Sequence, residues 1–365
     1  MIQHRTIEQE QVRALRQIVR AHGFQLFGAL PIGESDTFSH LVEWVDDGMH
    51  ADMDWMARPD ALEKRAQPSA ILPGAQSVMT LAFAYTPEPI PDALLNDPSR
   101  GIIARYALYD DYHDVVKKKL IQIGREVSAW CRDNGYGESD WKAYVDTGPF
   151  LEREWAQRAG LGFIGRNANL INVTLGSYLF LSEILFTAKL PVMEQKQQGS
   201  CARCTNCVGS CPTGAIVKDK TIDARKCISY QTIEQKGSIP EWIRPLMGNR
   251  IYGCDICQEV CPWNKSPQAV RHADFQVRED LVAPKFETLL FFDDEGFREK
   301  FRKSPIKRAK REGLMRNVAI GLGNWAARND RDDAVEAVRL LEIMKRNESS
   351  ALVQEHIDWG LAQVK

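Results

Sequence analysis

Apolar and polar positions follow two different periods along the N-terminal half of the chain. Apolar residues that recur every three or four positions predict helices at residues 7–22, 38–47 and 113–134, and a further helix that ends at Arg158. Short apolar runs bounded by glycine or proline predict strands at residues 24–29, 77–85 and 144–146. Residues 178–187 fit a strand or a helix equally well. Elements mixed in this way predict an α+β or α/β domain over residues 1–192.

The C-terminal part of the chain shows only the helical period. Residues 314–327 and 333–345 predict two helices that pair in the manner of a helical repeat, and residues 352–364 predict a third. A true solenoid normally needs three or more repeats. We therefore expect residues 271–365 to form a HEAT-like helical cap.

Length and composition indicate a folded protein of several domains. The chain has 365 residues, 44% of them hydrophobic, so two or three domains are expected. No stretch approaches the roughly 20 apolar residues that span a bilayer, and the chain does not open with an apolar signal peptide. We expect a cytoplasmic protein with no membrane partner and with reduced cysteines.

Eight of the nine cysteines belong to a ferredoxin-like pattern. Its two runs are Cys201-x2-Cys204-x2-Cys207-x3-Cys211-Pro212 and Cys254-x2-Cys257-x3-Cys261-Pro262, with Cys227 between them. In bacterial ferredoxins three closely spaced thiolates hold one 4Fe-4S cluster, and the cysteine before proline binds the other cluster. This rule assigns Cys201, Cys204, Cys207 and Cys261 to one cluster and Cys211, Cys227, Cys254 and Cys257 to the second. The predicted ferredoxin-like domain covers residues 193–270.

Other uses of these cysteines explain the pattern less well. Structural zinc also takes four thiolates, but it does not require the Cys-Pro pair that ends both runs. Disulfides do not fit a reducing compartment. The ninth cysteine, Cys131, lies in a predicted helix and is expected to be a partly buried packing residue.

A basic stretch precedes the C-terminal helices. From Arg298 to Arg316 the chain has nine Lys or Arg residues and two Glu, a local charge of +7, in a chain whose net charge is -2. A solvated helix face would explain it, and so would a phosphate-binding surface. It is the best indication of a nucleic-acid partner in this sequence.

Two other cofactors are disfavoured. Gly160-Leu161-Gly162-Phe163-Ile164-Gly165 fits the dinucleotide-binding string, but it follows a predicted helix where that motif follows a strand. Radical use of S-adenosylmethionine commonly needs C-x3-C-x2-C, and neither cysteine run has a third cysteine in place. A cluster pair alone is an electron carrier, so the long upstream domain is expected to receive the electrons.

The chain resembles the epoxyqueuosine reductase family over nearly its whole length. The resemblance is carried by MDWM at residues 53–56, LPGA at 72–75, RY at 105–106, DYH at 111–113, VDTG at 145–148, RAGLG at 158–162, RKCISY at 225–230 and GNRIYGCD at 248–255. Cysteine runs alone are shared with many ferredoxins, whereas their combination with the VDTG and GNRIYGCD segments is more specific.

The resemblance implies a cytosolic, cobalamin-dependent enzyme with two 4Fe-4S clusters. Such an enzyme removes the epoxide oxygen of epoxyqueuosine in tRNA, the last step of queuosine synthesis, with electrons from an unidentified low-potential donor. Asp146 matches the family's proton donor. An Asp with its ordinary pKa near 3.9 holds no proton at neutral pH, so we expect desolvation in a water-poor pocket to raise the pKa of Asp146. A turn or cap role is the alternative for this residue.

The same resemblance implies further contacts. Residues expected to contact cobalamin are Arg65, Ala104, Asp146, Asn167, Leu170, Leu181 and Ser229. Surface pairing of Arg65 and core packing of the two leucines are the alternatives. Asp111-x-His113 begins like the D-x-H-x-x-G cobalt-ligand motif, but residue 116 is Val, so His113 is not expected to bind cobalt. Residues expected to contact tRNA are Lys307, Arg308, Lys310 and Arg311.

Two other function classes stay open at this point. A reductive dehalogenase would use the same cofactors on a small substrate, but would have no use for the basic stretch, and those enzymes are typically exported behind a twin-arginine signal. A non-catalytic electron-transfer or cobalamin-handling protein would not need Asp146. No segment signals oligomerisation, and a monomer suits a large RNA substrate.

Overall fold

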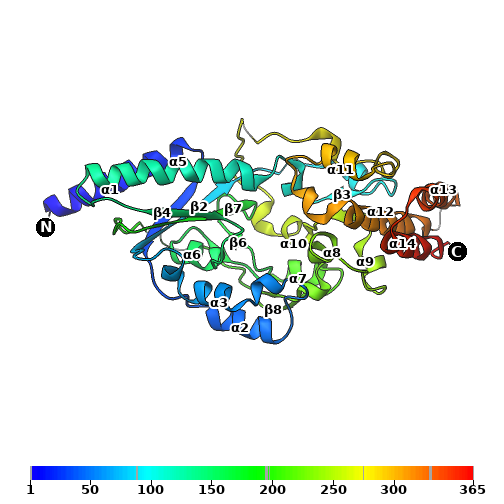
Figure 1. The fold of residues 1–365 in the computed structure, drawn as a ribbon, viewed down its shortest axis with the longest axis horizontal. Helices are drawn as coiled ribbons and strands as arrows, with labels where there is room; N and C mark the ends of the chain where they lie inside the picture. Colours follow the sequence, from blue (N-terminus) through cyan, green and yellow to red (C-terminus); the bar gives the residue numbers. More distant parts are fainter. Residues whose placement is uncertain are drawn as a thin grey trace.

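The computed structural model describes residues 2–87, 89–193, 196, 198–273, 275–328 and 331–364, with side chains described from residue 9 onward and, in α13, from residue 334. The molecule is elongated, with the two chain ends at opposite tips (Figure 1). Its larger helices are α1 Ile2–Ala21, α2 Phe38–Asp46, α3 Pro59–Ala66, α5 Tyr112–Asp133, α6 Glu152–Arg158, α12 Lys310–Ala326, α13 Arg331–Asn347 and α14 Ala351–Leu361. Shorter helices are α4 Asp92–Leu95, α7 Asn206–Ser210, α8 Ile228–Ile233, α9 Arg244–Met247, α10 Ile256–Glu259 and α11 Asp294–Lys300.

A four-stranded antiparallel sheet organises the N-terminal half. Its strands, in spatial order, are β1 Leu26–Pro31, β2 Ser77–Ala84, β7 Leu179–Phe186 and β4 Trp141–Val145. The central strand β2 is buried on both faces, which explains why its sequence is a continuous apolar run. Residues 178–187, which periodicity left undecided, form strand β7. Because the sheet is antiparallel, the domain is α+β.

Helices cover both faces of this sheet. Helices α1 and α5 lie on one face, and α6 lies on the other with α2 and α3 beyond it (Figure 1). Alternate residues of β2 follow this division: Leu81 packs with the α5 side, whereas Ala82 packs with Trp155 of α6. Gly124 lets α5 approach β4, since a Cβ there would come within 2.5 Å of the Trp141 ring.

The cysteine-rich segment, residues 200–264, is built from short elements. Besides α7 to α10 it contains β8 Ile216–Lys218, β9 Thr221–Ile222 and β10 Arg250–Tyr252. Strand β10 pairs in parallel with β3 Ile102–Ile103, which comes from the N-terminal half. The remaining strands β5 Phe163–Ile164 and β6 Leu170–Ile171 form a hairpin after α6. The glycine string at 160–165 thus follows a helix and includes strand β5 of the hairpin, unlike a dinucleotide-binding turn.

The C-terminal helices pack against the cysteine-rich segment. Arg316 of α12 is completely buried and donates hydrogen bonds to the backbone carbonyls of Gln231, Gln235 and Gly237. Its neighbour Asn317 donates to the carbonyls of Thr232 and Ile251. These bonds join α12 to both α8 and β10.

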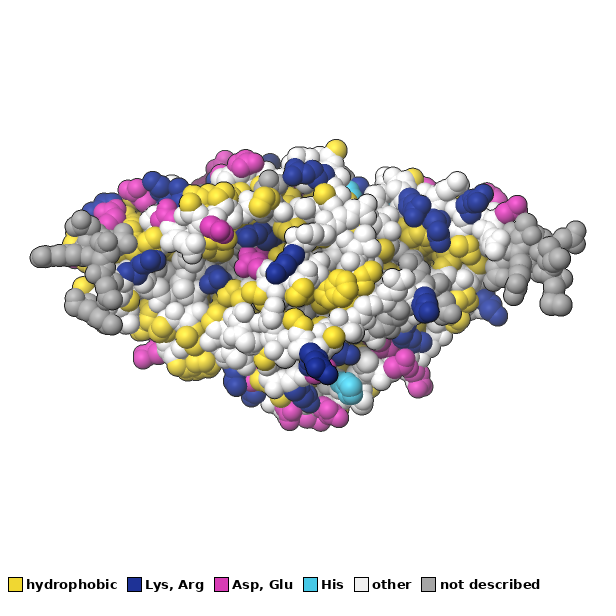
Figure 2. All heavy atoms as spheres, turned by 180° about the vertical axis from the view of Figure 1, so that it is seen from behind, with side chains coloured by type: hydrophobic (Ala, Val, Ile, Leu, Met, Phe, Trp, Pro, Cys, Tyr) yellow, Lys and Arg dark blue, Asp and Glu magenta, His cyan; other side chains and the backbone are white. Residues whose placement is uncertain are grey.

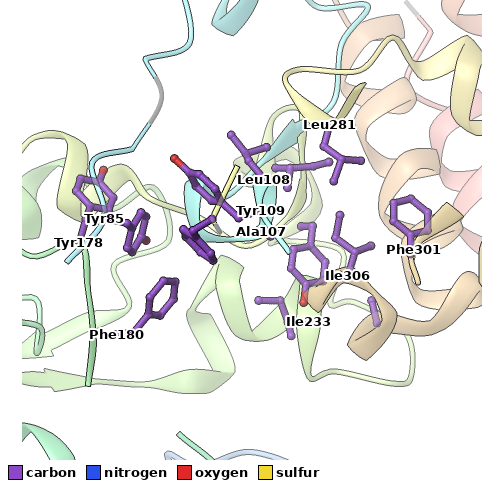
Figure 3. Close-up of a cluster of buried hydrophobic side chains, with 14 of the residues drawn as sticks. Tyr85, Ala107, Leu108, Tyr109, Tyr178, Phe180, Ile233, Leu281, Phe301 and Ile306 are labelled. Carbon is purple, nitrogen blue, oxygen red and sulfur yellow. The ribbon is translucent and has the colours of Figure 1, made fainter. Parts of the chain in front are cut away.

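One apolar core runs through all three regions. Figure 3 shows Tyr85 and Phe180 from the sheet region, Ile233 from the cysteine-rich segment, and Phe301 and Ile306 from the C-terminal region. The predicted boundaries at residues 192 and 270 therefore divide the sequence, while the packing is continuous across them. No helix in the described ranges is long and apolar enough to cross a membrane.

Candidate functional site

Asp146 lies in a tight loop directly after strand β4. Its backbone has φ = +57°, a left-handed conformation that Asp and Asn tolerate better than most residues. The next amide, of Thr147, donates to the Val145 carbonyl at 2.6 Å. Gly148 is required because a Cβ there would come within 2.6 Å of the Tyr144 ring. This loop directs the Asp146 side chain outward, where it is 58% exposed.

The first turn of α5 supplies the partners of Asp146. The Tyr112 hydroxyl donates to Asp146 Oδ2 at 2.7 Å, and His113 Nε2 lies 3.2 Å from the same oxygen. His113 Nδ1 lies 2.8 Å from Oδ1 of Asp111, the N-cap of α5. The other Asp111 oxygen pairs with Lys307 Nζ at 2.8 Å. A continuous chain of polar contacts thus links Asp146 to the basic stretch.

The protonation states along this series of polar contacts differ from what was expected for Asp146. Desolvation tends to raise the pKa of Asp146, but hydrogen bonds from His113 and Tyr112 outweigh it and lower the pKa below the ordinary value. Desolvation tends to lower the pKa of His113, yet its bonds to Asp111 and Asp146 raise that pKa to about 9. The prediction of a raised Asp146 pKa is therefore wrong for the protein alone, and the proton at neutral pH resides on His113.

Two glutamates lie behind Asp146. The Asp146 amide donates to Glu152 Oε1 at 2.7 Å. Glu183 of β7 is completely buried, and its carboxyl oxygens have no hydrogen-bond partner among the residues that the structure describes. Desolvation and the nearby Asp146 charge raise the pKa of Glu152 to about 8, and desolvation and Glu152 raise the pKa of Glu183 well above its ordinary value. At neutral pH both glutamates hold protons.

The arrangement can therefore store protons on two sides of one ionised carboxylate. His113 carries one on the α5 side, and the Glu152–Glu183 pair carries others on the α6 side. Asp146 is exposed between them, where a substrate can reach it. Geometry of this kind suits a reaction that consumes protons at an exposed carboxyl.

The eight patterned cysteines are free thiols that gather in two groups. Burial raises the pKa of Cys207 and Cys261, and so do their thiol neighbours, Cys201 and Cys261 for the first and Cys201 and Cys204 for the second. In the other group burial raises the pKa of Cys227, Cys254 and Cys257. Cys211 influences Cys227, Cys227 influences Cys254, and Cys254 and Cys227 influence Cys257, which Cys207 of the first group also influences. No three His, Cys, Asp or Glu side chains in the described ranges are close enough to share a single metal ion.

Residues predicted to contact cobalamin are mostly buried. Arg65, Ala104, Asn167 and Leu170 expose less than a tenth of their surface, whereas Leu181 and Ser229 are partly exposed. Leu170 and Leu181 pack in one apolar cluster on the α6 face of the sheet. The Asn167 side chain donates to the Cys257 carbonyl at 3.1 Å, which links this region to the cysteines.

The basic stretch contributes less free charge than its sequence indicated. Arg311 is only 17% exposed and forms a two-bond ion pair with Glu348, so it is the least accessible of the four residues expected to contact tRNA. Arg316 is buried. Lys307, Arg308 and Lys310 remain at the surface, the first two in ion pairs with Asp111 and Glu234. Basic and acidic side chains are interspersed on the face shown in Figure 2.

Sequence reasoning missed three members of the site: Tyr112, Glu152 and Glu183. His113 was considered only as a metal ligand, and its place beside Asp146 was not anticipated. One signal was available, because Glu183 interrupts the apolar run YLFLSEILF with a charge. Tyr112 and Glu152 gave no such signal, since both lie near the start of an amphipathic helix where polar residues are common.

Two protein-family models match the segments that contain the patterned cysteines and Asp146. The family model described as "4Fe-4S double cluster binding domain" matches residues 200–264, and "Epoxyqueuosine reductase QueG, DUF1730" matches residues 65–147. The epoxyqueuosine reductase of Pseudomonas aeruginosa is 39% identical over 345 residues, which cover 94% of this chain and 91% of the relative. This chain belongs to the epoxyqueuosine reductase family. The Escherichia coli epoxyqueuosine reductase is also 39% identical, over 93% of this chain and 86% of its own.

Solved epoxyqueuosine reductases share the fold of this chain. A selenomethionine-labelled epoxyqueuosine reductase and one bound to a tRNA-Tyr epoxyqueuosine-modified stem loop each superpose with a TM-score of 0.80 at 27% identity. Both cover 98% of this chain, and this chain covers 100% and 99% of them. In an epoxyqueuosine reductase from Bacillus subtilis, with a TM-score of 0.79, an aspartate catalytic loop is swung out of the active site.

Proposed function

We propose that this protein reduces epoxyqueuosine in tRNA to queuosine. Removing an epoxide oxygen to leave an alkene consumes two electrons and two protons and releases water. The observation that carries the proposal is the exposed Asp146 carboxylate between His113 and Glu152, two groups that hold protons at neutral pH. Family membership supports the substrate, because the relatives are epoxyqueuosine reductases.

Asp146 acts as the proton donor to the departing oxygen in this proposal. The carboxylate is ionised in the protein alone, so it takes up a proton from His113 or from the Glu152–Glu183 pair before it donates one. Approach of a bulky substrate would also exclude water from Asp146, which raises the pKa of a carboxyl. In the positive-φ loop this side chain is 58% exposed and open to an approaching substrate.

Electrons reach the site through two 4Fe-4S clusters in this proposal. Cys201, Cys204, Cys207 and Cys261 would hold one cluster, and Cys211, Cys227, Cys254 and Cys257 the other. The family model for a double cluster domain over residues 200–264 supports the pair of clusters. The mutual influence of the thiols within each group supports the assignment.

The residues near the sheet fit cobalamin as the electron acceptor. Leu181 is partly exposed over the buried Leu170 and would give a macrocycle an apolar contact. Glu183, two residues along β7 on the same face, has carboxyl oxygens with no hydrogen-bond partner in the described residues and lies buried behind this contact. Arg65, Ser229 and the backbone of Ala104 and Asn167 would complete the contacts, with Asp146 facing the substrate side. Bound cobalamin would supply a strongly reducing, nucleophilic cobalt.

The tRNA contact is assigned to the surface residues of the basic stretch. Lys307 pairs with Asp111, and Arg308 pairs with Glu234. Lys310 is exposed two residues further along the chain. Helices α12, α13 and α14 would serve as the HEAT-like cap that presents this stretch. A monomer acting in the cytoplasm, with a low-potential electron donor, completes the proposal.

An anaerobic conversion assay tests it. Cluster-reconstituted protein is incubated with cobalamin, a low-potential reductant and tRNA that contains epoxyqueuosine, and the digested nucleosides are identified by mass spectrometry. We expect queuosine to form, and to disappear when cobalamin is omitted or when Asp146→Asn replaces the wild type. Asn is the matched control because it tolerates positive φ and keeps both hydrogen bonds without carrying a proton. Full activity of Asp146→Asn would refute its role as the proton donor, and no conversion by cluster-loaded wild type would refute the proposed function.

A further inference from the structure

An exposed tryptophan and an arginine meet at the edge of the site. Trp55, in the short helix Asp54–Met56, is 39% exposed. The guanidinium carbon of Arg308 lies 5.1 Å from the centre of its ring. The two residues come from opposite ends of the sequence, and nothing in the proposed chemistry uses this pair.

Helix α8 holds both partners in place. Tyr230 exchanges hydrogen bonds of 3.1 Å with the amide and the carboxylate of Asp52, which anchors the loop that carries Trp55. Glu234, at the C-terminal end of α8, binds the Arg308 guanidinium through Nε and Nη2 at 2.9 to 3.1 Å. A bidentate pair of this kind fixes the plane of the guanidinium. Both groups are therefore oriented before any ligand binds.

The pair is close to the reactive carboxylate. Arg308 directly follows Lys307, which pairs with Asp111 at 2.8 Å. Asp111 in turn contacts His113, and His113 lies 3.2 Å from Asp146. A ligand that places one group at Asp146 thus has its adjoining part within reach of Trp55 and Arg308. An exposed cation–π contact contributes little to stability. A purely structural role therefore does not explain why Trp55 and Arg308 lie together at the surface.

An unpaired nucleobase is the ligand that this chemistry recognises best. Bases in RNA loops stack on aromatic rings and on arginine planes, and the neighbouring phosphates attract the arginine charge. Trp55 offers the ring and Arg308, which is 54% exposed, offers both the plane and the charge. Stacking of this kind is tolerant of base identity, so the site does not require a particular base beside the modified nucleotide.

We propose that Trp55 and Arg308 form a stacking site for the unpaired base next to the modified nucleotide of the RNA substrate. The inference rests on the proposed function for the identity of the RNA. The inference is more specific than the proposed function, because it concerns the base beside the reacting nucleotide and assigns Trp55 a role in substrate binding.

Binding of four stem-loop RNAs by cluster-loaded protein tests the site. One RNA carries epoxyqueuosine in an intact loop, two others each have an abasic residue in place of one flanking base, and the fourth has the intact loop without the modification. Affinities are measured by fluorescence anisotropy at one salt concentration, for wild type and Trp55→Ala. We expect Trp55→Ala to weaken binding of the intact loop by about fivefold or more, as for loss of one stacked base. The same variant should not weaken binding of the RNA that lacks the stacked base.

Control variants separate stacking from fold. Trp55→Phe should retain much of the affinity, because it keeps an aromatic face. Trp242→Ala removes a tryptophan that is 52% exposed in the loop before α9 and should change none of these affinities. If Trp55→Ala weakens binding of the intact loop and of both abasic loops equally, or of none of them, the stacking site is wrong. Suppose that Trp55→Ala weakens binding but that wild-type protein binds the modified and unmodified loops with equal affinity. The stacking site would then stand, and the result would count against the proposed substrate.

Discussion

Replacing Glu152 by Gln should make the protein more stable and less active. Glu152 is partly buried next to Glu183 and Asp146, and its pKa rises from the ordinary 4.5 to about 8. Because the folded-state pKa lies above the unfolded one, the carboxyl favours folding fully below pH 4.5, and this contribution is lost as pH rises through about 8. Wild-type stability therefore declines across that window.

The size of the effect follows from the pKa difference. At about 1.4 kcal/mol per pKa unit, keeping Glu152 in this position destabilises the protein by on the order of 2–5 kcal/mol above pH 8, with Glu183 sharing part of it. Gln keeps an oxygen to accept the Asp146 amide and adds an N–H that can donate to Glu183. The destabilisation at high pH is removed without opening a cavity.

Melting midpoints of cluster-loaded protein, measured anaerobically at pH 5.5 and pH 8.5, check the prediction. Glu152→Gln should melt at least about 3 °C above wild type at pH 8.5 and much closer to it at pH 5.5. The matched control is Glu154→Gln, two residues away on the same helix, where the carboxylate accepts hydrogen bonds from the amides of Asp36 and Thr37 and from the Thr37 hydroxyl. That variant should melt lower at both pH values. An equal gap between Glu152→Gln and wild type at the two pH values would refute this account of Glu152.

Three further predictions concern the proton donor, the clusters and the RNA surface. Single-turnover rates of wild type should fall as pH rises through about 9, because His113 loses its proton there. In His113→Gln this fall should occur at lower pH. Identical pH profiles of the two proteins would contradict the role of His113. Cys227→Ser should reduce bound iron from about eight to about four atoms per chain, measured by iron analysis, whereas Cys131→Ser should leave it unchanged. Lys310→Glu should make the salt dependence of tRNA binding weaker, so that the plot of log affinity against log salt is less steep by about one. Arg311→Glu should instead lower the melting temperature, because it breaks the ion pair with Glu348.

Local patterns in the sequence predicted most elements of the fold but few of its long-range contacts. Helix α5 and strand β2 have periodic apolar residues and clear end signals, and their predicted bounds lie within a residue of the observed ones. Strand β7 was undecided because a strand buried on both sides loses its alternation. The pairing of β3 with β10 had no local signal, since β3 has only two residues and its partner lies far along the chain.

The site was predictable only where a residue type is diagnostic by itself. Cysteine spacing is strongly constrained by cluster geometry, so the pattern indicated a double cluster domain, which the family model confirms. Asp146 came from family resemblance, and the direction of its pKa was wrong because His113 and Tyr112 approach it from another helix. Counting basic residues overestimated the free charge, because the sequence does not show that Glu348 neutralises Arg311.

The burial of Arg316 and Asn317 against α8 and β10 has a consequence for biosynthesis. The segment that carries the cysteines is complete in the nascent chain well before α12 leaves the ribosome, yet its backbone carbonyls at Gln231, Thr232 and Ile251 find their partners only on α12. Domains generally fold as units during synthesis, N-terminal first. Here these carbonyls of the cysteine-rich segment obtain their partners only once α12 has been synthesised, so we expect stable insertion of iron and sulfide to follow translation of α12.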